Sequence, residues 1–240
     1  MQNFNYKEHY KIDALEFDYF EEKFGATLHD ERRVHEVILH SLPKVYSSVL
    51  DVGCGNAWLA ERLTPQSKKV ISFDLSHTNT KKAKDRIKSD FHKQTVGDSL
   101  QLPFKDNSID LVVSSEVIEH IADPKRFVSE LFRVTKPGGS VIITTPYKEV
   151  LQYILCVHCN KVTTLHAHIH SFDEHILAGF HPLESKDFDY TLFGNKLLIF
   201  ARTYVLLKYL PFSLWRLVDW LANKVYNKPV HILVEYKKTH

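Results

Sequence analysis

The sequence is poor in cysteine and has no long uncharged apolar run. Three cysteines in 240 residues rule out a disulfide framework and are typical of a reducing compartment. Charged residues and a proline interrupt the longest apolar tract, residues 197–221, so no membrane-spanning helix is expected. Residues 1–11 lack the apolar centre of a secretory signal. These absences predict a cytoplasmic globular protein.

No sign of charge dominates, since 31 Lys and Arg residues face 29 Asp and Glu residues. Avid binding to nucleic acid is therefore not expected. Internal repeats and low-complexity linkers are also missing, which favours one domain over residues 1–240. Within it we expect a helical N-terminal cap (1–45), a core (46–147), a Cys- and His-rich segment with a helix and the sixth strand (148–195), an apolar helical insert (196–228) and a last strand (229–240).

The core alternates short apolar runs with helical stretches. Helices are expected over 8–42 with a break near Gly25, and over 57–63, 76–88, 124–134, 172–180 and 197–226. Strands are expected over 49–52, 70–73, 94–96, 109–114, 141–144 and 230–236. Such alternation predicts parallel pairing in an α/β doubly wound sheet, which a strand arriving after a long excursion can join antiparallel.

A nucleotide-type pattern follows the first expected strand. The run Asp51-Val52-Gly53-Cys54-Gly55 stands at the strand end, where glycine lets the backbone approach a ligand closely. Asp74 ends the second strand, where a carboxylate can accept hydrogen bonds from ribose hydroxyls. Trp58 occupies the third glycine position of the nicotinamide fingerprint, which disfavours an NAD-linked oxidoreductase.

Four runs together resemble the class I S-adenosylmethionine-dependent methyltransferases. They are VLDVGCGNAWLAERL, ISFDLS, GDSLQLPFKDNSIDLVVSSEVIEHI and LFRVTKPGGSVIITTP, within residues 45–147. The resemblance implies a Rossmann-like methyltransferase fold: seven strands, mostly parallel, with the last strand antiparallel. It also implies that S-adenosylmethionine is the cofactor.

The resemblance assigns cofactor contacts to particular residues of this chain. Asp51, Gly53, Cys54 and Gly55 would line the methionine part. Asp74 would bind the ribose, with Leu75 beside the adenine, and Asp98 would accept a hydrogen bond from the adenine amino group, with Ser99 next to it. Ser115 and Glu116 would lie near the sulfonium.

A first metal pattern, Glu116-x-x-Glu119-His120, follows the fourth strand. Carboxylates and one imidazole suit Mg²⁺ or Mn²⁺. The segment resembles that of ubiquinone-pathway O-methyltransferases and of small-RNA 2′-O-methyltransferases, which add a histidine from a stretch like His168-Ile169-His170-Ser171-Phe172. Glu119, His120 and His170 are therefore the candidate catalytic residues. The alternative makes Glu119 and His120 structural.

A second metal pattern, Cys156-x-x-Cys159 with His166 and His168, suits structural zinc. His170 cannot serve both metals. The alternative is a pair of reduced cysteines in a helix.

We expect a methyltransferase that acts on the hydroxyl of a small molecule: a sugar, a phenol or quinone-like ring, or a lipid-linked acceptor. The alternatives are a ribose 2′-O-methyltransferase acting on RNA, and a non-catalytic binding module with this fold. Residues 197–221 form a lid over an apolar acceptor, a peripheral membrane contact or a packed insert.

Overall fold

The computed structural model describes residues 5–157, 159–181 and 188–239. Its centre is a seven-stranded sheet in the order β3-β2-β1-β4-β5-β9-β8, in which β9 runs antiparallel to both of its neighbours. The strands of this sheet are β1 (Ser48–Val52), β2 (Lys69–Asp74), β3 (His92–Val96), β4 (Ile109–Ser115), β5 (Thr135–Pro146), β8 (Phe188–Asn195) and β9 (Pro229–Lys237). The seven strands and the antiparallel last strand confirm the expected fold.

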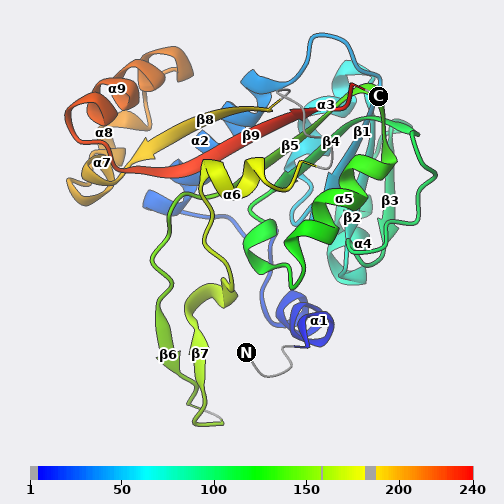
Figure 1. Ribbon diagram of the computed structural model, residues 1–240, viewed down its shortest axis with the longest axis horizontal. Coiled ribbons are helices and arrows are strands. Elements are labelled where there is room, and N and C mark those ends of the chain that lie inside the picture. Colours follow the sequence, from blue (N-terminus) through cyan, green and yellow to red (C-terminus); the bar gives the residue numbers. More distant parts are fainter. Residues whose placement is uncertain (1–4, 158, 182–187, 240) are drawn as a thin grey trace.

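Helices cover both faces of the sheet (Figure 1). They are α1 (Tyr6–Glu16), α2 (Gly25–Ser41), α3 (Trp58–Leu63), α4 (His77–Arg86), α5 (Pro124–Val134), α6 (Glu174–Ala178), α7 (Lys196–Phe200), α8 (Tyr204–Leu207) and α9 (Phe212–Val225). Short 3-10 turns span Thr64–Gln66, Ile118–His120 and Leu165–Ala167.

The sheet has a separate apolar core on each face, because successive strand residues point to opposite sides. Leu50 and Val112 pack on the face that α5 and α6 cover. Their neighbours Val49 and Leu111 pack on the other face, against α2, α3 and α9. Two buried faces explain why these strands read as continuous apolar runs rather than as alternating ones.

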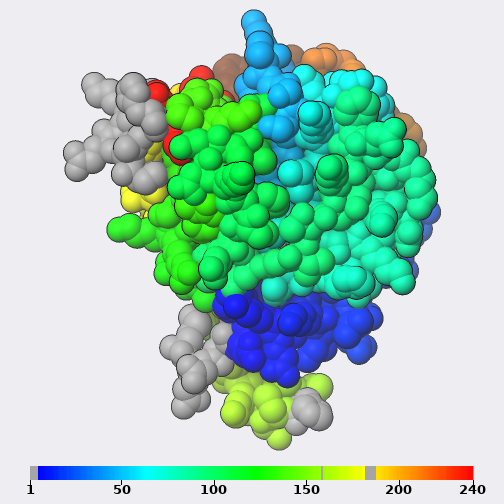
Figure 2. Space-filling view, turned by 90° about the vertical axis from the view of Figure 1, so that its right-hand side faces the viewer, coloured from blue at the N-terminus to red at the C-terminus, as the bar shows by residue number. Residues whose placement is uncertain are grey.

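Two segments project from the edge where the parallel strands end. The hairpin of β6 (Tyr153–Leu155) and β7 (Val162–Thr164) extends away from the sheet, and α1 lies beside it below the same edge (Figures 1 and 2). The helices α7, α8 and α9 form an insert beside β8, at one end of the sheet (Figure 1). In the described part of the chain, no helix is long and apolar enough to cross a membrane.

The sequence-based boundaries differ from the structure at several elements. The helix expected over 8–42 divides into α1 and α2, and α2 begins at Gly25. The segment 172–180 contains only the five-residue α6, and the strand expected over 141–144 already begins at Thr135. The two cysteines of the Cys-x-x-Cys pattern follow a strand rather than lying in a helix.

Candidate functional site

A cleft of about 1770 Å³ opens where β1, β2, β3 and β4 end. The strand ends form its floor, while α1 and the β6–β7 hairpin form its walls. A pocket for one small ligand is typically about 300–1,000 Å³. The cleft is therefore large enough for a cofactor and a second molecule side by side.

Most of the residues expected to bind the cofactor line this cleft. They are Gly53, Gly55, Asp74, Leu75, Asp98, Ser99 and Glu116. The other three, Asp51, Cys54 and Ser115, are not among the described lining residues, and Asp51 and Cys54 are buried beneath the floor. Burial raises the pKa of the Cys54 thiol well above its usual value, so this cysteine is a packing residue and not a nucleophile.

Gly53 forms the turn between β1 and α3. Its φ of +76° lies in the region that glycine adopts without strain, and its N–H donates to the carbonyl of Phe73 at 2.8 Å. A Cβ atom at this position would lie 2.4 Å from Cγ2 of Val117. The backbone at Gly53 therefore lies so close to Val117 that only glycine fits at this position.

The Asp74 carboxylate is held in place at the end of β2. The N–H of Ser76 donates to its Oδ1 at 2.8 Å, and the N–H of Gly55 donates to its Oδ2 at 3.2 Å. Burial raises the pKa of Asp74, whereas these two backbone hydrogen bonds lower it. An oriented carboxylate in this position can accept hydrogen bonds from the two hydroxyls of a ribose.

Helix α1 contacts the floor of the cleft through Asp98. Tyr6 donates its hydroxyl to Asp98 at 2.8 Å, and Nζ of Lys7 lies 2.7 Å from the same carboxylate. Burial and the Asp98 carboxylate raise the pKa of Tyr6 to about 12, so the phenol stays protonated and donates. Sequence reasoning missed Tyr6 and Lys7, because nothing local in α1 indicates which strand end it covers.

The cleft carries more negative than positive charge. Its charged lining residues are Asp13, Asp30, Asp74, Asp98 and Glu116 against Lys23 and Lys161. S-adenosylmethionine has a cationic sulfonium and an ammonium group, and its ribose matches a strand-end carboxylate. The residues present therefore fit this cofactor.

Asp51 is a buried carboxyl group beside this cleft. Its Oδ2 has no hydrogen-bond partner among the described residues, and burial together with the nearby Asp74 raises its pKa from 3.8 to about 7. An ammonium group at this end of the cleft would complement the charged form.

The raised pKa of Asp51 predicts a dependence of stability on pH. Between about pH 4 and pH 7 the folded protein holds a proton on Asp51 that the unfolded chain has lost, so raising the pH destabilises the fold. Across this range, the free energy of unfolding of the ligand-free wild type should fall relative to that of Asp51→Asn. Urea denaturation of both proteins at several pH values measures the difference. If the free energies of unfolding of the two proteins changed in parallel with pH, the raised pKa of Asp51 would be contradicted.

Two histidines face the cleft at the end beyond β4. Nδ1 of His168 lies 2.6 Å from Oε2 of Glu149, which favours the tautomer with a free Nε2. The ring of His120 lies edge-on to that of His168, with 4.8 Å between the ring centres. Burial and His168 lower the pKa of His120 to about 4. Glu149 was not among the expected site residues, because its role depends on a histidine 19 positions later in the chain.

His120 and His168 are joined by Glu119 in a group whose potential ligand atoms lie within 4.8 Å of one another. Oε2 of Glu119 accepts a hydrogen bond from Thr145, and its Oε1 has no hydrogen-bond partner among the described residues. A carboxylate and two imidazoles are ligands for a divalent transition metal. Glu119 is buried below the cleft, so its side chain reaches these histidines and not the cleft itself.

The structure does not bring together the metal-ligand sets expected from the sequence. Cys156 and Cys159 lie in the turn of the β6–β7 hairpin, whereas His166 and His168 follow the far end of β7. In the described residues these four side chains therefore form no zinc site. Glu116 contacts His231 instead of joining Glu119 and His120.

His170, expected to be catalytic, has a different position from His168. It is not among the described residues that line the cleft, and its ring packs against Phe172. Its N–H and that of Ile169 donate to the carbonyl of Glu119, which fixes this loop. The structure thus places His168, rather than His170, beside His120 in the cleft.

A buried histidine, His231, and two partly exposed carboxylates form the wall of the cleft between β4 and α2. Nε2 of His231 lies 3.0 Å from Oδ2 of Asp30, and its Nδ1 lies 3.3 Å from Oε2 of Glu116, though without hydrogen-bond alignment. Burial lowers the pKa of His231, but the two carboxylates outweigh it and raise this pKa well above its usual value. His231 therefore stays charged and fixes Glu116, whose φ is +55°.

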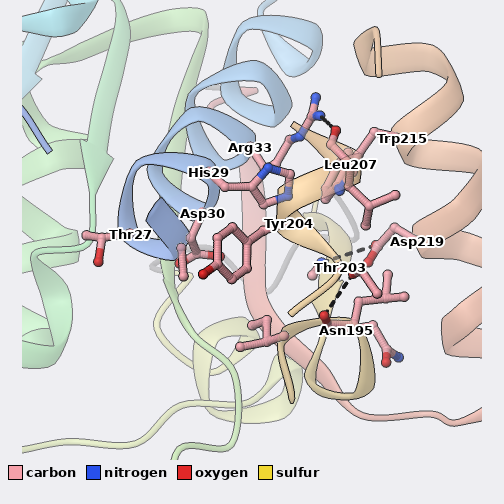
Figure 3. A pocket seen from close by; sticks show the side chains of 14 residues that line it. Thr27, His29, Asp30, Arg33, Asn195, Thr203, Tyr204, Leu207, Trp215 and Asp219 are labelled. Carbon is pink, nitrogen blue, oxygen red and sulfur yellow. Dashed lines mark hydrogen bonds between the residues drawn. The ribbon is translucent and has the colours of Figure 1, made fainter. Parts of the chain in front are cut away.

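A second cavity, of about 260 Å³, lies behind this wall, between α2 and the α7–α9 insert (Figure 3). Thr27 and Asp30 line both cavities, so the two are neighbours. The lining is mostly apolar and includes Leu198, Leu207 and Trp215. Three buried polar atoms of its lining residues have no hydrogen-bond partner in the described residues: His29 Nδ1, Arg33 Nε and Asp219 Oδ1.

Comparisons with known proteins agree with this geometry. Residues 50–143 match the family model described as "Methyltransferase domain". A probable S-adenosylmethionine-dependent methyltransferase of Mycolicibacterium smegmatis is 35% identical over 117 residues, which are 48% of this chain and 44% of the relative. A chloroplastic tocopherol O-methyltransferase of Arabidopsis thaliana is 40% identical over 107 residues, which are 42% of this chain and 31% of the relative.

Among solved structures, phosphoethanolamine N-methyltransferase 2 of Haemonchus contortus with S-adenosyl-L-methionine has a TM-score of 0.64 at 17% identity. The match covers 100% of this chain and 61% of that chain and concerns the fold alone. This chain spans less than half the length of the two curated relatives. Residues 50–143 therefore match the methyltransferase domain family, and this part of the chain is similar to S-adenosylmethionine-dependent methyltransferases.

Proposed function

We propose that this protein is an enzyme that transfers a methyl group from S-adenosylmethionine to a hydroxyl of a small, partly apolar molecule. The observation that carries the choice of a hydroxyl is the pair of His168 and Glu149 on the acceptor side of the cleft. An imidazole that a carboxylate orients is suited to take a proton from an acceptor.

The order of the strands divides the cleft into a cofactor side and an acceptor side. Asp98, Asp74 and Gly53 follow β3, β2 and β1, so they would hold the adenine, the ribose and the methionine part in that order. The cofactor supplies a methyl group that its sulfonium already activates. The protein's task is then to exclude water and to align the acceptor oxygen.

On the acceptor side, a proton must leave the hydroxyl as the oxygen is methylated. Nε2 of His168 can accept it, while Glu149 holds Nδ1–H and stabilises the imidazolium that results. His120 lies next to this pair and lines the same part of the cleft. A bound divalent metal would be held by Glu119, His120 and His168 and would lower the pKa of an acceptor hydroxyl.

The second cavity supports an acceptor with an apolar part. It adjoins the cleft at Thr27 and Asp30, and its walls are mostly apolar. Its 260 Å³ would take a small ring or the first carbons of a chain. Among the relatives, the tocopherol O-methyltransferase is named for a lipid-soluble phenol, which agrees with such an acceptor.

The test is transfer of a labelled methyl group from S-adenosylmethionine into a small-molecule extract, with mass spectrometry of the product. A methyl ether on an apolar product is expected, and ribonuclease treatment of the extract should leave the yield unchanged. A labelled methylamine would overturn the oxygen acceptor. Loss of label after ribonuclease would favour the RNA enzyme. Binding of S-adenosylhomocysteine without transfer to any extract would favour a binding module.

A further inference from the structure

The α7–α9 insert exposes many large apolar side chains. Residues 196–228 hold twelve large exposed apolar side chains: Leu197, Ile199, Phe200, Val205, Leu206, Tyr209, Leu214, Leu217, Trp220, Leu221, Val225 and Tyr226. Some of these side chains are almost fully exposed: Phe200 is 83% and Val225 is 86% exposed. Large apolar patches are rare on monomeric proteins and mark contact sites.

Helix α9 shows that this exposure follows a pattern. Leu214, Leu217, Leu221 and Val225 recur at intervals of three and four residues, which places them in one stripe along the helix. This stripe faces solvent, because Trp215 on the opposite side is buried against the protein. Helix α9 therefore carries an apolar stripe on its outer face, in addition to the buried Trp215.

The charges of the insert are almost all positive. Residues 196–228 contain six basic residues: Lys196, Arg202, Lys208, Arg216, Lys224 and Lys228. Asp219 is the single acidic residue in this range, and it is buried with 3% exposure. The whole chain carries a net charge of only +2, so the positive charge is concentrated at this end.

The partner of this surface must therefore be apolar and negatively charged over a broad area. A lipid bilayer with anionic headgroups has both properties. Lysine and arginine side chains can reach headgroup phosphates while apolar neighbours enter the acyl boundary. Trp220 and Tyr209, which are exposed, are of the residue types enriched at that depth.

We propose that the outer face of residues 196–228 binds the surface of a bilayer that contains anionic lipids. The contact is interfacial, since none of these helices is long enough to cross a membrane. Side chains from the inner face of the same insert, among them Leu207 and Trp215, line the second cavity (Figure 3). If the proposed function is right, an acceptor could enter that cavity from the lipid; this consequence rests on the proposed function, whereas membrane binding does not.

The test mixes the full chain with vesicles, without cofactor or acceptor, and measures how much protein sediments with them. Vesicles of phosphatidylcholine with phosphatidylglycerol should bind the protein, and vesicles of phosphatidylcholine alone should bind it at least several-fold more weakly. Leu217→Gln with Leu221→Gln should reduce binding roughly tenfold or more, because two exposed leucines no longer enter the bilayer. Lys224→Glu with Lys228→Glu should reduce binding to the vesicles with phosphatidylglycerol but not to those of phosphatidylcholine alone. Added salt should have the same selective effect.

Matched controls separate this face from general effects. Val45→Gln changes an exposed valine, 91% accessible, in the loop before β1, and Lys81→Glu with Lys84→Glu changes two exposed lysines of α4. These variants should bind vesicles like the wild type, and all variants should keep its melting temperature.

Equal binding to both vesicle types, or equal loss in the control variants, would overturn the proposal. So would a dimer that the leucine variant dissociates without any vesicle binding, because the face would then contact a second copy. Methyl transfer to acceptors dissolved in detergent does not require a bilayer. It therefore tests the proposed function separately from membrane binding.

Discussion

Replacing Gly53 by valine is expected to abolish the binding of S-adenosylhomocysteine. The Cβ atom alone would lie 2.4 Å from Cγ2 of Val117, and φ at this position is +76°, where branched side chains are strained. To relieve the overlap, either the β1–α3 turn or the Val117 wall must move, and both line the cleft. Overpacking of this size costs on the order of 100-fold or more in affinity. Calorimetric titration with S-adenosylhomocysteine measures it.

Gly138 provides the matched control for backbone strain. Its φ is +78°, but a Cβ atom there would meet nothing within 4 Å. Gly138→Val should therefore lose some stability to the same strain and still bind the ligand normally. A milder pair isolates the overlap itself: Gly53→Ala should weaken binding, and adding Val117→Ala should restore part of it. Normal affinity in Gly53→Val would mean that the ligand does not depend on the β1–α3 turn.

The parallel core was predictable because its signals are local. A buried parallel strand is a short apolar run. Gly53 follows β1 directly, and β2 and β4 end at the polar residues Asp74 and Ser115. The strand order then brings Gly53, Asp74 and Asp98 to one edge, so the cofactor half of the cleft could be predicted from spacing. Asp51 and Cys54 stand close to Gly53 in the sequence but are buried, which the pattern alone does not show.

The acceptor half could not be predicted, because its contacts join distant parts of the chain. His120 contacts the carbonyl of Ala167 across 47 positions, and His231 contacts Asp30 across 201. The β6–β7 hairpin is short and its strand residues are mostly exposed, so it has no apolar alternation to distinguish it from a helix. That hairpin determines which histidines face the cleft, and it places the cysteines at the opposite end from His166 and His168. Spacing alone suggested zinc ligands where the structure provides an imidazole–carboxylate pair.

His168→Gln is expected to lower turnover by about 10²–10⁴-fold, the range for loss of a positioned proton acceptor. Glutamine keeps a hydrogen-bonding group near Glu149 but cannot accept a proton at neutral pH. Affinity for S-adenosylhomocysteine should stay near that of the wild type, because Asp74 and Asp98 lie on the other side of the cleft. Glu149→Gln should lower turnover less, since the imidazole remains and only its orientation and charge stabilisation are weakened.

His166→Gln is the control for this prediction. His166 lines the same cleft two residues earlier, and among the described residues it has no carboxylate within hydrogen-bonding distance. Its turnover should stay within a few-fold of the wild type. EDTA then separates the two roles open to His168: a base needs no metal, whereas a ligand in the group with Glu119 and His120 does. Inhibition by EDTA with recovery on adding Mn²⁺ or Zn²⁺ would make His168 a metal ligand. Wild-type turnover in His168→Gln would exclude both roles and leave His120 and His166 as the imidazoles beside this part of the cleft.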